Sequence, residues 1–323
     1  MCLTNETLSL AIETMSAESP SVIEEFLSER QVMMIAGEPG VGKSIIASQL
    51  AISLSSQTAV FGCLAVPSPR RVFYLQLEGT LEQSMERLKR MRQAIPIQTE
   101  NIHWEFQRTF NVLESPQVTT LIEHIKTWEA PDVVIIDPLY QCVFGELAKE
   151  LPCKALLKFI DSLRAAFSKC AVILVHHTRK PTYGADGVRV QEDDAFFGSQ
   201  WLKAYVDTSY NLRKYSQKYK DQVILENKKN RGGDVLKELI LHYDPETDTC
   251  SGAVELAEQS GYERVIKFLH TKKLAGLTTD FYEVMGACHL SYRAVRTIQQ
   301  LLLTRKLLRC DKVLGKKKIW EPY

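Results

Sequence analysis

A glycine-rich stretch near the start of the chain has the residue types and spacing of a phosphate-binding loop. In GEPGVGKS, residues 37–44, the residues Gly37, Gly42, Lys43 and Ser44 match the pattern G-x-x-x-x-G-K-[ST]. The glycines let the backbone N–H groups point at a phosphate, the lysine adds a positive charge, and the serine hydroxyl can bind Mg²⁺. We therefore expect ATP and Mg²⁺ here, with a glycine-rich turn and a chance lysine as the alternative. The expected nucleotide contacts are Gly37, Glu38, Pro39, Gly40, Val41, Gly42, Lys43, Ser44 and Ile45.

Two carboxylates further along the chain could complete such a site. The segment PDVVIID, residues 131–137, ends four apolar residues with Asp137, which is the pattern of a buried strand that presents one carboxylate to Mg²⁺. Ser44 and Asp137 are therefore the expected metal-binding residues. Glu78 follows the strand-like run RVFYLQL, residues 71–77, so its carboxylate can hold and deprotonate a water beside the phosphates.

Imidazole and cationic side chains could contact the same phosphates. His176 and His177 follow the apolar run AVILV, residues 171–175. Such a pair is more often structural or metal-binding, but no third ligand is near in the sequence, so we favour phosphate sensing by His177. Lys229 and Arg231 are two residues apart at an expected strand end, so both can point to one phosphate. An ordinary exposed cationic turn at these residues is the alternative.

These residues lie on alternating strands and helices, which predict an α/β fold with a mainly parallel sheet. An apolar strand at 31–36 precedes the phosphate-binding loop, and a helix at 44–55 follows it, so that the helix N-terminus can favour a phosphate. Two antiparallel strands at 207–212 and 222–226 are expected to extend the sheet, and a turn at 244–248 is expected to close the region. The other expected elements are strands at 71–77, 102–106, 132–137, 171–175 and 236–243 and helices at 81–93, 115–128 and 152–167.

The order of these parts resembles the RecA-like hexameric ATPase core, and within it the RepA-type replicative helicases of broad-host-range plasmids. The resemblance spans about residues 20–250, and its motifs are GEPGVGKS, YLQLEGT, VVIIDPL, VILVHHTRK, GSQW and ENKKNRGG. We expect the ATPase domain to be residues 20–254. The sequence departs from that family in an acidic segment, QEDD at 191–194, and in a long C-terminal extension.

The resemblance implies particular roles for these residues. Glu78 would activate water, His177 would sense the γ-phosphate, and Lys229 with Arg231 would enter the site of a neighbouring subunit in a hexamer. The loop after His177 would line a central channel and touch single-stranded DNA. Its cationic candidates are Arg179, Lys180 and Arg189.

The C-terminal extension is basic. From Gly261 to Tyr323 it has 13 Lys and Arg against 5 Asp and Glu, a net charge of +8, whereas the whole chain has +1. Three expected helices, the second capped by Thr278 or Thr279, and a hairpin resemble a winged helix-turn-helix domain at residues 255–323, an α+β fold. In that fold the third helix enters the major groove of duplex DNA and the wing binds phosphates. The candidate contacts are Tyr292, Arg293, Arg296, Lys316, Lys317 and Lys318. A winged helix that binds protein is the alternative.

The composition argues against a membrane protein and against a secreted, disulfide-bonded protein. No apolar run approaches a membrane span, and the first residues lack a signal-peptide profile, so we expect no membrane partner. The eight cysteines are scattered without a C-x-x-C pair, which argues against a zinc site or a disulfide framework and favours a reducing cytoplasm. Residues 1–19 are expected to form a helical arm.

The sequence leaves three functional interpretations. The first is an ATP-hydrolysing homo-oligomer that acts on DNA, a replicative helicase of a plasmid, phage or mobile element. The second is an ATP-switched DNA-binding regulator or loader without unwinding activity. The third is a RecA-like clock- or signalling-type ATPase whose winged helix binds protein.

Overall fold

The chain forms two compact units, residues 1–253 and 254–323. The computed structural model describes residues 19–143, 149–178, 200–214, 221–231, 238–252, 265–266, 268–273, 279–288, 295–296, 298–299, 302–303, 308–309, 313–314 and 317–322. The helix expected within residues 1–19 and the loop expected after His177 lie outside these residues. No helix in the described part of the chain has both the length and the apolar character needed to cross a membrane.

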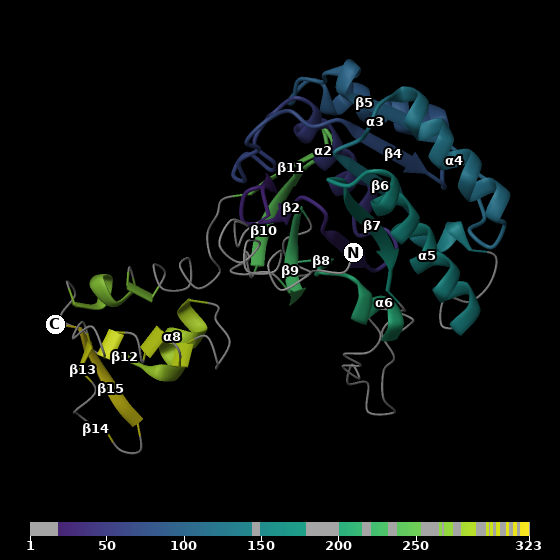
Figure 1. Cartoon of the computed structure of the whole chain (residues 1–323). Coiled ribbons are helices and arrows are strands. Elements are labelled where there is room, and N and C mark those ends of the chain that lie inside the picture. The colour runs from purple at the N-terminus through teal and green to yellow at the C-terminus, as the bar shows by residue number, and fades with distance from the viewer. Residues whose placement is uncertain are drawn as a thin grey trace, which may run out of the picture. The chain divides into compact units, whose positions relative to one another are not determined.

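One sheet, with nine strands among the described residues, organises the first unit (Figure 1). Its spatial order is β11-β10-β9-β8-β3-β7-β6-β4-β5. The strands from β8 to β5 run parallel, and β9, β10 and β11 add to the β8 edge as antiparallel strands. The predicted mainly parallel sheet with an antiparallel extension is thus confirmed. The strands are β3 (Val32–Gly37), β4 (Val72–Gln76), β5 (Ile102–Phe106), β6 (Val133–Asp137), β7 (Ala171–His177), β8 (Thr208–Lys214), β9 (Gln222–Asn230), β10 (Glu238–Asp244) and β11 (Thr249–Gly252).

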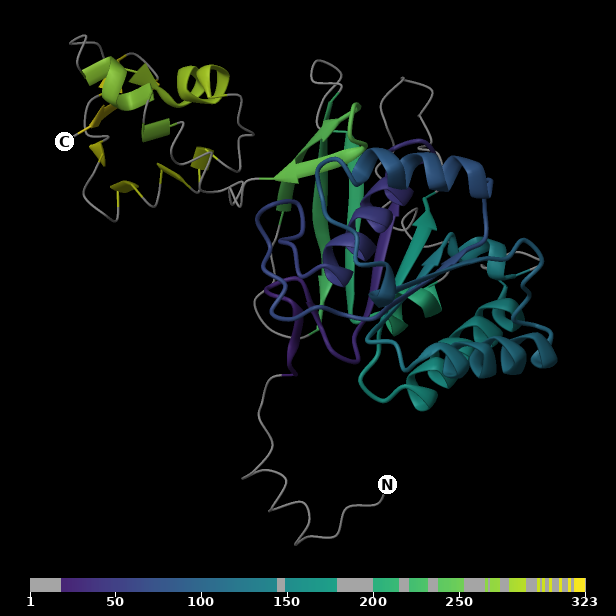
Figure 2. The ribbon, with the colours of Figure 1, turned by 90° about the horizontal axis from the view of Figure 1, so that it is seen from above.

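Helices cover both faces of this sheet (Figure 2). One face packs against α2, onto which the end of α3 folds. The other face packs against α4, α5 and α6. The helices are α2 (Lys43–Ser55), α3 (Leu81–Met91), α4 (Ser115–Trp128), α5 (Glu150–Ala166) and α6 (Gln200–Tyr205), with short 3₁₀ turns η1 (Thr99–Asn101) and η2 (Leu139–Cys142) and a small hairpin of β1 (Ser21–Ile23) and β2 (Leu27–Ser28).

Strand β3, which leads into the phosphate-binding loop, is buried on both of its faces. Met33 and Ile35 point into the core on the α2 face, whereas Val32, Met34 and Ala36 point into the core on the α4–α5 face. A strand buried on both faces needs apolar residues at every position, and this one has them. The loop therefore starts from a central strand that lies between β7 and β8 and is covered on both faces.

Strand β11 is an element that the sequence did not predict. It follows the turn at 244–248 that was expected to close the region, and it pairs with β10. Gln49 of α2 holds it by two hydrogen bonds, donating Nε2 to the Cys250 carbonyl and accepting the Cys250 N–H, both at 2.7 Å. A buried amide of α2 thus ties the antiparallel edge back to the helix of the phosphate-binding loop.

The second unit has helical residues at 265–266 and 268–273, then β12 (Thr279–Asp280), α8 (Phe281–Ala287), helical residues between 295 and 303, and β13 (Leu308–Arg309), β14 (Val313–Leu314) and β15 (Lys317–Pro322). The strands pair antiparallel in the order β12-β15-β13, and β14 also pairs with β15. Its core comprises Val265, Leu269, Val284, Cys288, Val295, Ile298, Leu302, Leu308 and Trp320.

The cap of α8 differs from the expectation. Asp280 caps the helix, accepting hydrogen bonds from the N–H groups of Tyr282 and Glu283 at 2.9 Å each. The predicted threonine cap is wrong because the helix begins at Phe281, one residue later than expected, so that Asp280 precedes it. The Thr279 hydroxyl donates to the Glu283 carboxylate at 2.8 Å.

Candidate nucleotide site

The phosphate-binding loop joins β3 to α2, and two of its glycines are required for different reasons. Gly42, the residue before α2, has φ +102°, a conformation that side chains strongly disfavour. Gly37 ends β3 beside β8, where an added Cβ would lie 2.5 Å from the Leu212 carbonyl oxygen. The loop glycines therefore serve both the turn and the close approach of two strands.

Lys43 is the buried cation of the loop, with 4% of its surface exposed. Its Nζ donates to the carbonyl oxygens of Gly37 at 2.9 Å and Glu38 at 2.8 Å. Burial lowers the pKa of this ammonium to about 8, and the nearby carboxylates of Asp137, Glu78 and Glu38 oppose that shift. A desolvated cation at the start of α2 is a strong point charge for a polyanion.

Asp137 ends β6 and reaches the loop from the other side. It accepts a hydrogen bond from the Ser44 hydroxyl at 3.2 Å and one from the Tyr74 hydroxyl at 2.6 Å. Burial raises the pKa of Asp137, while the two donors lower it. Neighbouring hydroxyl and carboxylate oxygens suit Mg²⁺, which prefers few protein ligands and a phosphate oxygen. Ser44 and Asp137 thus fit the expected metal.

Glu78 lies just beyond β4, next to β6 in the sheet. Its carboxylate is 53% exposed, accepts a hydrogen bond from the Tyr140 hydroxyl at 3.0 Å, and lies 3.9 Å from His177 Nε2. Tyr140 also packs edge-on against the His177 ring, with centroids 5.1 Å apart. The structure therefore brings together the predicted base, the predicted sensor and a tyrosine that sequence reasoning missed.

The backbone at Glu78 is fixed by Gln76, a second residue missed from the sequence. Gln76 Nε2 donates to the Glu78 carbonyl at 2.7 Å. The Gln76 amide oxygen accepts from the Ser84 hydroxyl at 2.7 Å and from the Trp104 indole N–H at 2.8 Å. The signal was present in β4, where VFYLQ interrupts a buried run with Tyr74 and Gln76, two polar side chains that need buried partners.

The two histidines of β7 occupy different environments. His176 is buried, and burial lowers the pKa of its imidazole to about 4, with smaller contributions from His177 and Lys43. His177 is half-buried, and burial followed by the charge of Lys43 lowers its pKa too. Both imidazoles are therefore neutral near pH 7, and only His177 faces Glu78.

Comparison with known proteins shows the family of this chain. Residues 6–182, more than half of the chain, match the model of a protein family described as the AAA domain. The chain belongs to the AAA domain family. No curated protein matches it.

Solved structures show the fold of this AAA-family chain. It is similar to the ATPase domain of G40P, with a TM-score of 0.52 and 16% identity, over 77% of this chain and 96% of that one. It is also similar to the structure of a DnaB-like replicative helicase that was described with its interactions with primase. That TM-score is 0.51 at 16% identity, over 76% of this chain and 66% of that one. The first unit thus has a RecA-like P-loop ATPase fold.

The two predicted trans-acting cations lie together at the end of β9 and contact their own subunit. Lys229 Nζ donates to the carbonyl oxygens of Ala204 and Val206 at the end of α6, at 3.0 and 2.5 Å. Arg231 donates to the same Ala204 carbonyl and lies 3.8 Å from Asp207. The shared acceptor shows that the two side chains point the same way. Their action on a neighbouring subunit stays a prediction.

Three of the nine predicted DNA contacts lie within the described residues. Arg296 is exposed, on helical residues whose neighbours Val295 and Ile298 are buried. The backbones of Lys317 and Lys318 lie in β15. The rest lie outside the described residues: Arg179, Lys180, Arg189, Tyr292, Arg293 and Lys316.

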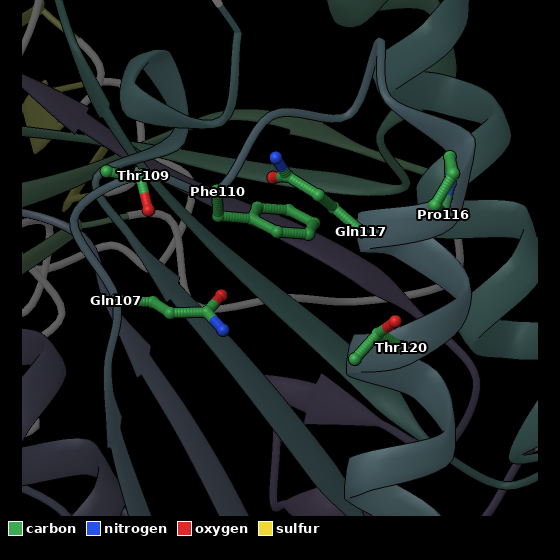
Figure 3. Close-up of a pocket in the computed structure, with 6 residues that line it drawn as sticks. All are labelled: Gln107, Thr109, Phe110, Pro116, Gln117 and Thr120. Carbon is green, nitrogen blue, oxygen red and sulfur yellow. The ribbon is translucent and has the colours of Figure 1, made fainter.

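A cavity of about 240 Å³ lies away from the phosphate-binding loop, between the segment that follows β5 and the first turns of α4 (Figure 3). Its lining residues are Gln107, Thr109, Phe110, Pro116, Gln117 and Thr120. None of the predicted nucleotide-binding residues lines it, so this cavity is separate from the candidate nucleotide site.

Proposed function

We propose that this chain hydrolyses ATP as the motor of an oligomer that acts on DNA. The observation that carries the proposal is the hydrogen bond of 3.2 Å between Ser44 and Asp137, beside the buried Lys43. Ser44 lies in the first turn of α2 and Asp137 ends β6, 93 positions further along the chain. A carboxylate, a hydroxyl and an ammonium that converge in this way are suited to a metal-bound phosphate.

The residues would divide the reaction between them. Lys43 would bind the β- and γ-phosphates, and Ser44 with Asp137 would hold Mg²⁺, which supplies charge neutralisation to the phosphates. Glu78 would accept a proton from the attacking water, and Tyr140 would keep its carboxylate turned toward that water. His177, which is neutral and adjacent to Glu78, would donate a hydrogen bond from an imidazole N–H to the γ-phosphate and so report its loss.

The site would be completed by a second copy of the chain, in a ring that we propose is a hexamer. Lys229 and Arg231 form a cationic pair on the surface, and an arginine from a neighbour stabilises charge that develops on the γ-phosphoryl oxygens. The similarity in fold to a DnaB-like replicative helicase supports this arrangement.

The second unit would bind duplex DNA as a winged helix. The order helix, strand, helix, helix and then strands, with β15 between β12 and β13, supports this proposal. Arg296 is exposed beside buried Val295, which suits a helix that reads a groove. In the full chain, Arg296→Glu should weaken duplex binding, and each lost phosphate contact should reduce the log–log salt slope by about 0.9. An unchanged slope would favour a protein partner instead.

The proposed motor is a replicative helicase of a plasmid, phage or mobile element, and a forked-duplex assay tests it. With ATP and Mg²⁺, the wild-type chain should displace the labelled strand, while Lys43→Ala should not. ATP-dependent DNA binding without displacement would identify the alternative, an ATP-switched regulator or loader. Hydrolysis that DNA neither stimulates nor requires, together with no DNA binding, would remove DNA from the proposal.

A further inference from the structure

Three side chains of types that bind metal ions meet at the edge strand β5, on the face of the sheet that α4 covers. None of them belongs to the candidate nucleotide site. His103 and Glu105 are two residues apart on β5, so both point to one face of the strand. His124 of α4 reaches the same point. The Glu105 Oε2 atom lies 3.2 Å from His103 Nε2 and 3.3 Å from His124 Nε2, and all three donor atoms lie within 4.8 Å of one another.

Aromatic packing holds these imidazoles in place. The His103 ring stacks on Phe73 of β4, with centroids 4.9 Å apart and planes 6° apart, and Trp128 of α4 contacts it at 5.4 Å. The His124 ring meets His103 edge-on at 5.4 Å. The donor atoms are thus directed by rings that are packed, and less side-chain freedom has to be lost when a ligand binds.

Two of the three separations between the donor atoms suit a tetrahedral metal site, and the third is within 4.8 Å. Bonds of about 2.0–2.1 Å at tetrahedral angles place neighbouring ligand atoms about 3.3 Å apart. The two measured separations, 3.2 and 3.3 Å, match this value. Hydrogen bonds would explain the same distances only if both imidazoles carry their proton on Nε2 and share one oxygen acceptor. Two imidazoles and one carboxylate are instead a common ligand set for Zn²⁺.

We propose that His103, Glu105 and His124 bind one zinc-class divalent ion, with a water as the fourth ligand. Two nitrogen donors favour Zn²⁺, Co²⁺ or Ni²⁺ over Mg²⁺ and Ca²⁺, which prefer oxygen, so this site and the Ser44–Asp137 site select different ions. The ion would join the edge strand β5 to α4. It would thereby fix the segment between them, which carries part of the cavity lining of Figure 3.

Calorimetric titration of Zn²⁺ into the chelator-treated full chain tests the proposal. The wild type should bind one equivalent that is lost, or weakened at least tenfold, in His124→Ala and in Glu105→Gln. His124 is 45% exposed, so its substitution should leave the fold intact, which far-ultraviolet circular dichroism checks. His242→Ala, at an exposed histidine of β10, is the matched control and should bind as the wild type does.

The visible absorption spectrum of bound Co²⁺ reports the coordination geometry, which non-specific binding would not reproduce. The wild type and His242→Ala should show the intense visible bands of a four-coordinate ion, and His124→Ala should not. Zn²⁺ should also raise the melting temperature of the first two proteins only, because an ion that binds the folded state stabilises it. Equal stoichiometry and equal spectra in His124→Ala and His242→Ala would overturn the proposal. ATP hydrolysis enters none of these measurements, so the outcome is independent of the proposed motor.

Discussion

The two carboxylates of the nucleotide site are held in opposite ways. Asp137 is 4% exposed and accepts hydrogen bonds from Tyr74 and Ser44. The Glu78 side chain is 53% exposed, and Tyr140 donates to it at 3.0 Å. A buried carboxylate with one buried and one half-buried donor has little freedom to turn, whereas an exposed carboxylate can turn when its partner moves. The half of the site that binds is therefore preorganised, and the half that would hydrolyse is adjustable.

The largest effect should come from the preorganised half. Lys43→Ala removes the buried cation while Asp137 and Glu78 remain, so ATP binding and turnover should both be lost. Calorimetry with ATP and steady-state ATPase assays measure the two quantities. The matched control is Lys154→Ala, which removes an exposed lysine paired with Glu150 and should change neither. Wild-type turnover by Lys43→Ala would show that ATP is not hydrolysed at this site.

The next largest effect should come from the cation that would act between subunits. Arg231→Ala is expected to lower kcat by about 10³–10⁵, the worth of an inserted arginine in related NTPases. Because Arg231 also contacts the end of α6, a loss of activity alone is ambiguous. Mixing the inactive Arg231→Ala and Lys43→Ala proteins should restore activity. At some interfaces of the mixed oligomer, the first protein supplies an intact Lys43 and the second supplies an intact Arg231. Arg213→Ala is the exposed control, and full activity of monomeric Arg231→Ala would rule out a shared site.

A matched pair of substitutions compares the two carboxylates directly. Glu78→Gln should keep ATP and Mg²⁺ binding and slow hydrolysis by about 10²–10⁴, the usual contribution of a general base. Asp137→Asn should instead raise the Mg²⁺ concentration needed for half-maximal turnover. Titrations of ATP and of Mg²⁺ with both variants separate these results. If Glu78→Gln turns over normally, the base lies elsewhere.

The pH dependence of binding should report Lys43. Its pKa is about 8, so the ammonium is charged below that pH and needs no proton when a polyanion binds. Above pH 8 the free protein holds a neutral amine, and binding must take up a proton. The Kd for ATP should therefore rise by up to about tenfold per pH unit above 8. Calorimetry at pH 7.5 and 9 measures this, and equal affinities would contradict the assigned cause.

The smallest effect should come from the support of Glu78. Tyr140→Phe removes one exposed hydrogen bond of 3.0 Å, worth about 1 kcal/mol, so kcat should fall by about fivefold with the Kd for ATP unchanged. Tyr205→Phe is the control, because it removes a similar tyrosine–carboxylate bond to Asp161 outside the site. A fall in ATP affinity with unchanged kcat would place Tyr140 in the binding half instead.

Local patterns explain what could be predicted. The strand before the loop and the helix after it follow from an apolar run and a glycine-rich turn, and each needs only neighbouring residues to be recognised. The parallel sheet follows because strands and helices alternate, and the antiparallel pairing of β8 and β9 follows because the two strands are close together in the sequence. The threonine cap before α8 was wrong because the helix begins one residue later than expected, so that Asp280 precedes it.

Contacts between distant segments explain what could not be predicted. Tyr140 and Glu78 are 62 positions apart, and Gln49 and Cys250 are 201 apart. No periodicity in the sequence encodes such pairs, since they depend on which strand ends become neighbours in the sheet. The same holds for His103 and His124, whose meeting depends on where α4 crosses β5.

The sequence alone determined that this chain contains a phosphate-binding loop, a strand that ends in a carboxylate and a sheet that could bring them together. These are short-range properties, because backbone conformation and burial of a strand depend mainly on nearby residue types. Only the tertiary structure decided that Tyr74 and Ser44 share Asp137, that Tyr140 holds Glu78, and that three ligands meet beside β5. Side chains from separate elements meet only when packing has fixed the register and crossing of those elements.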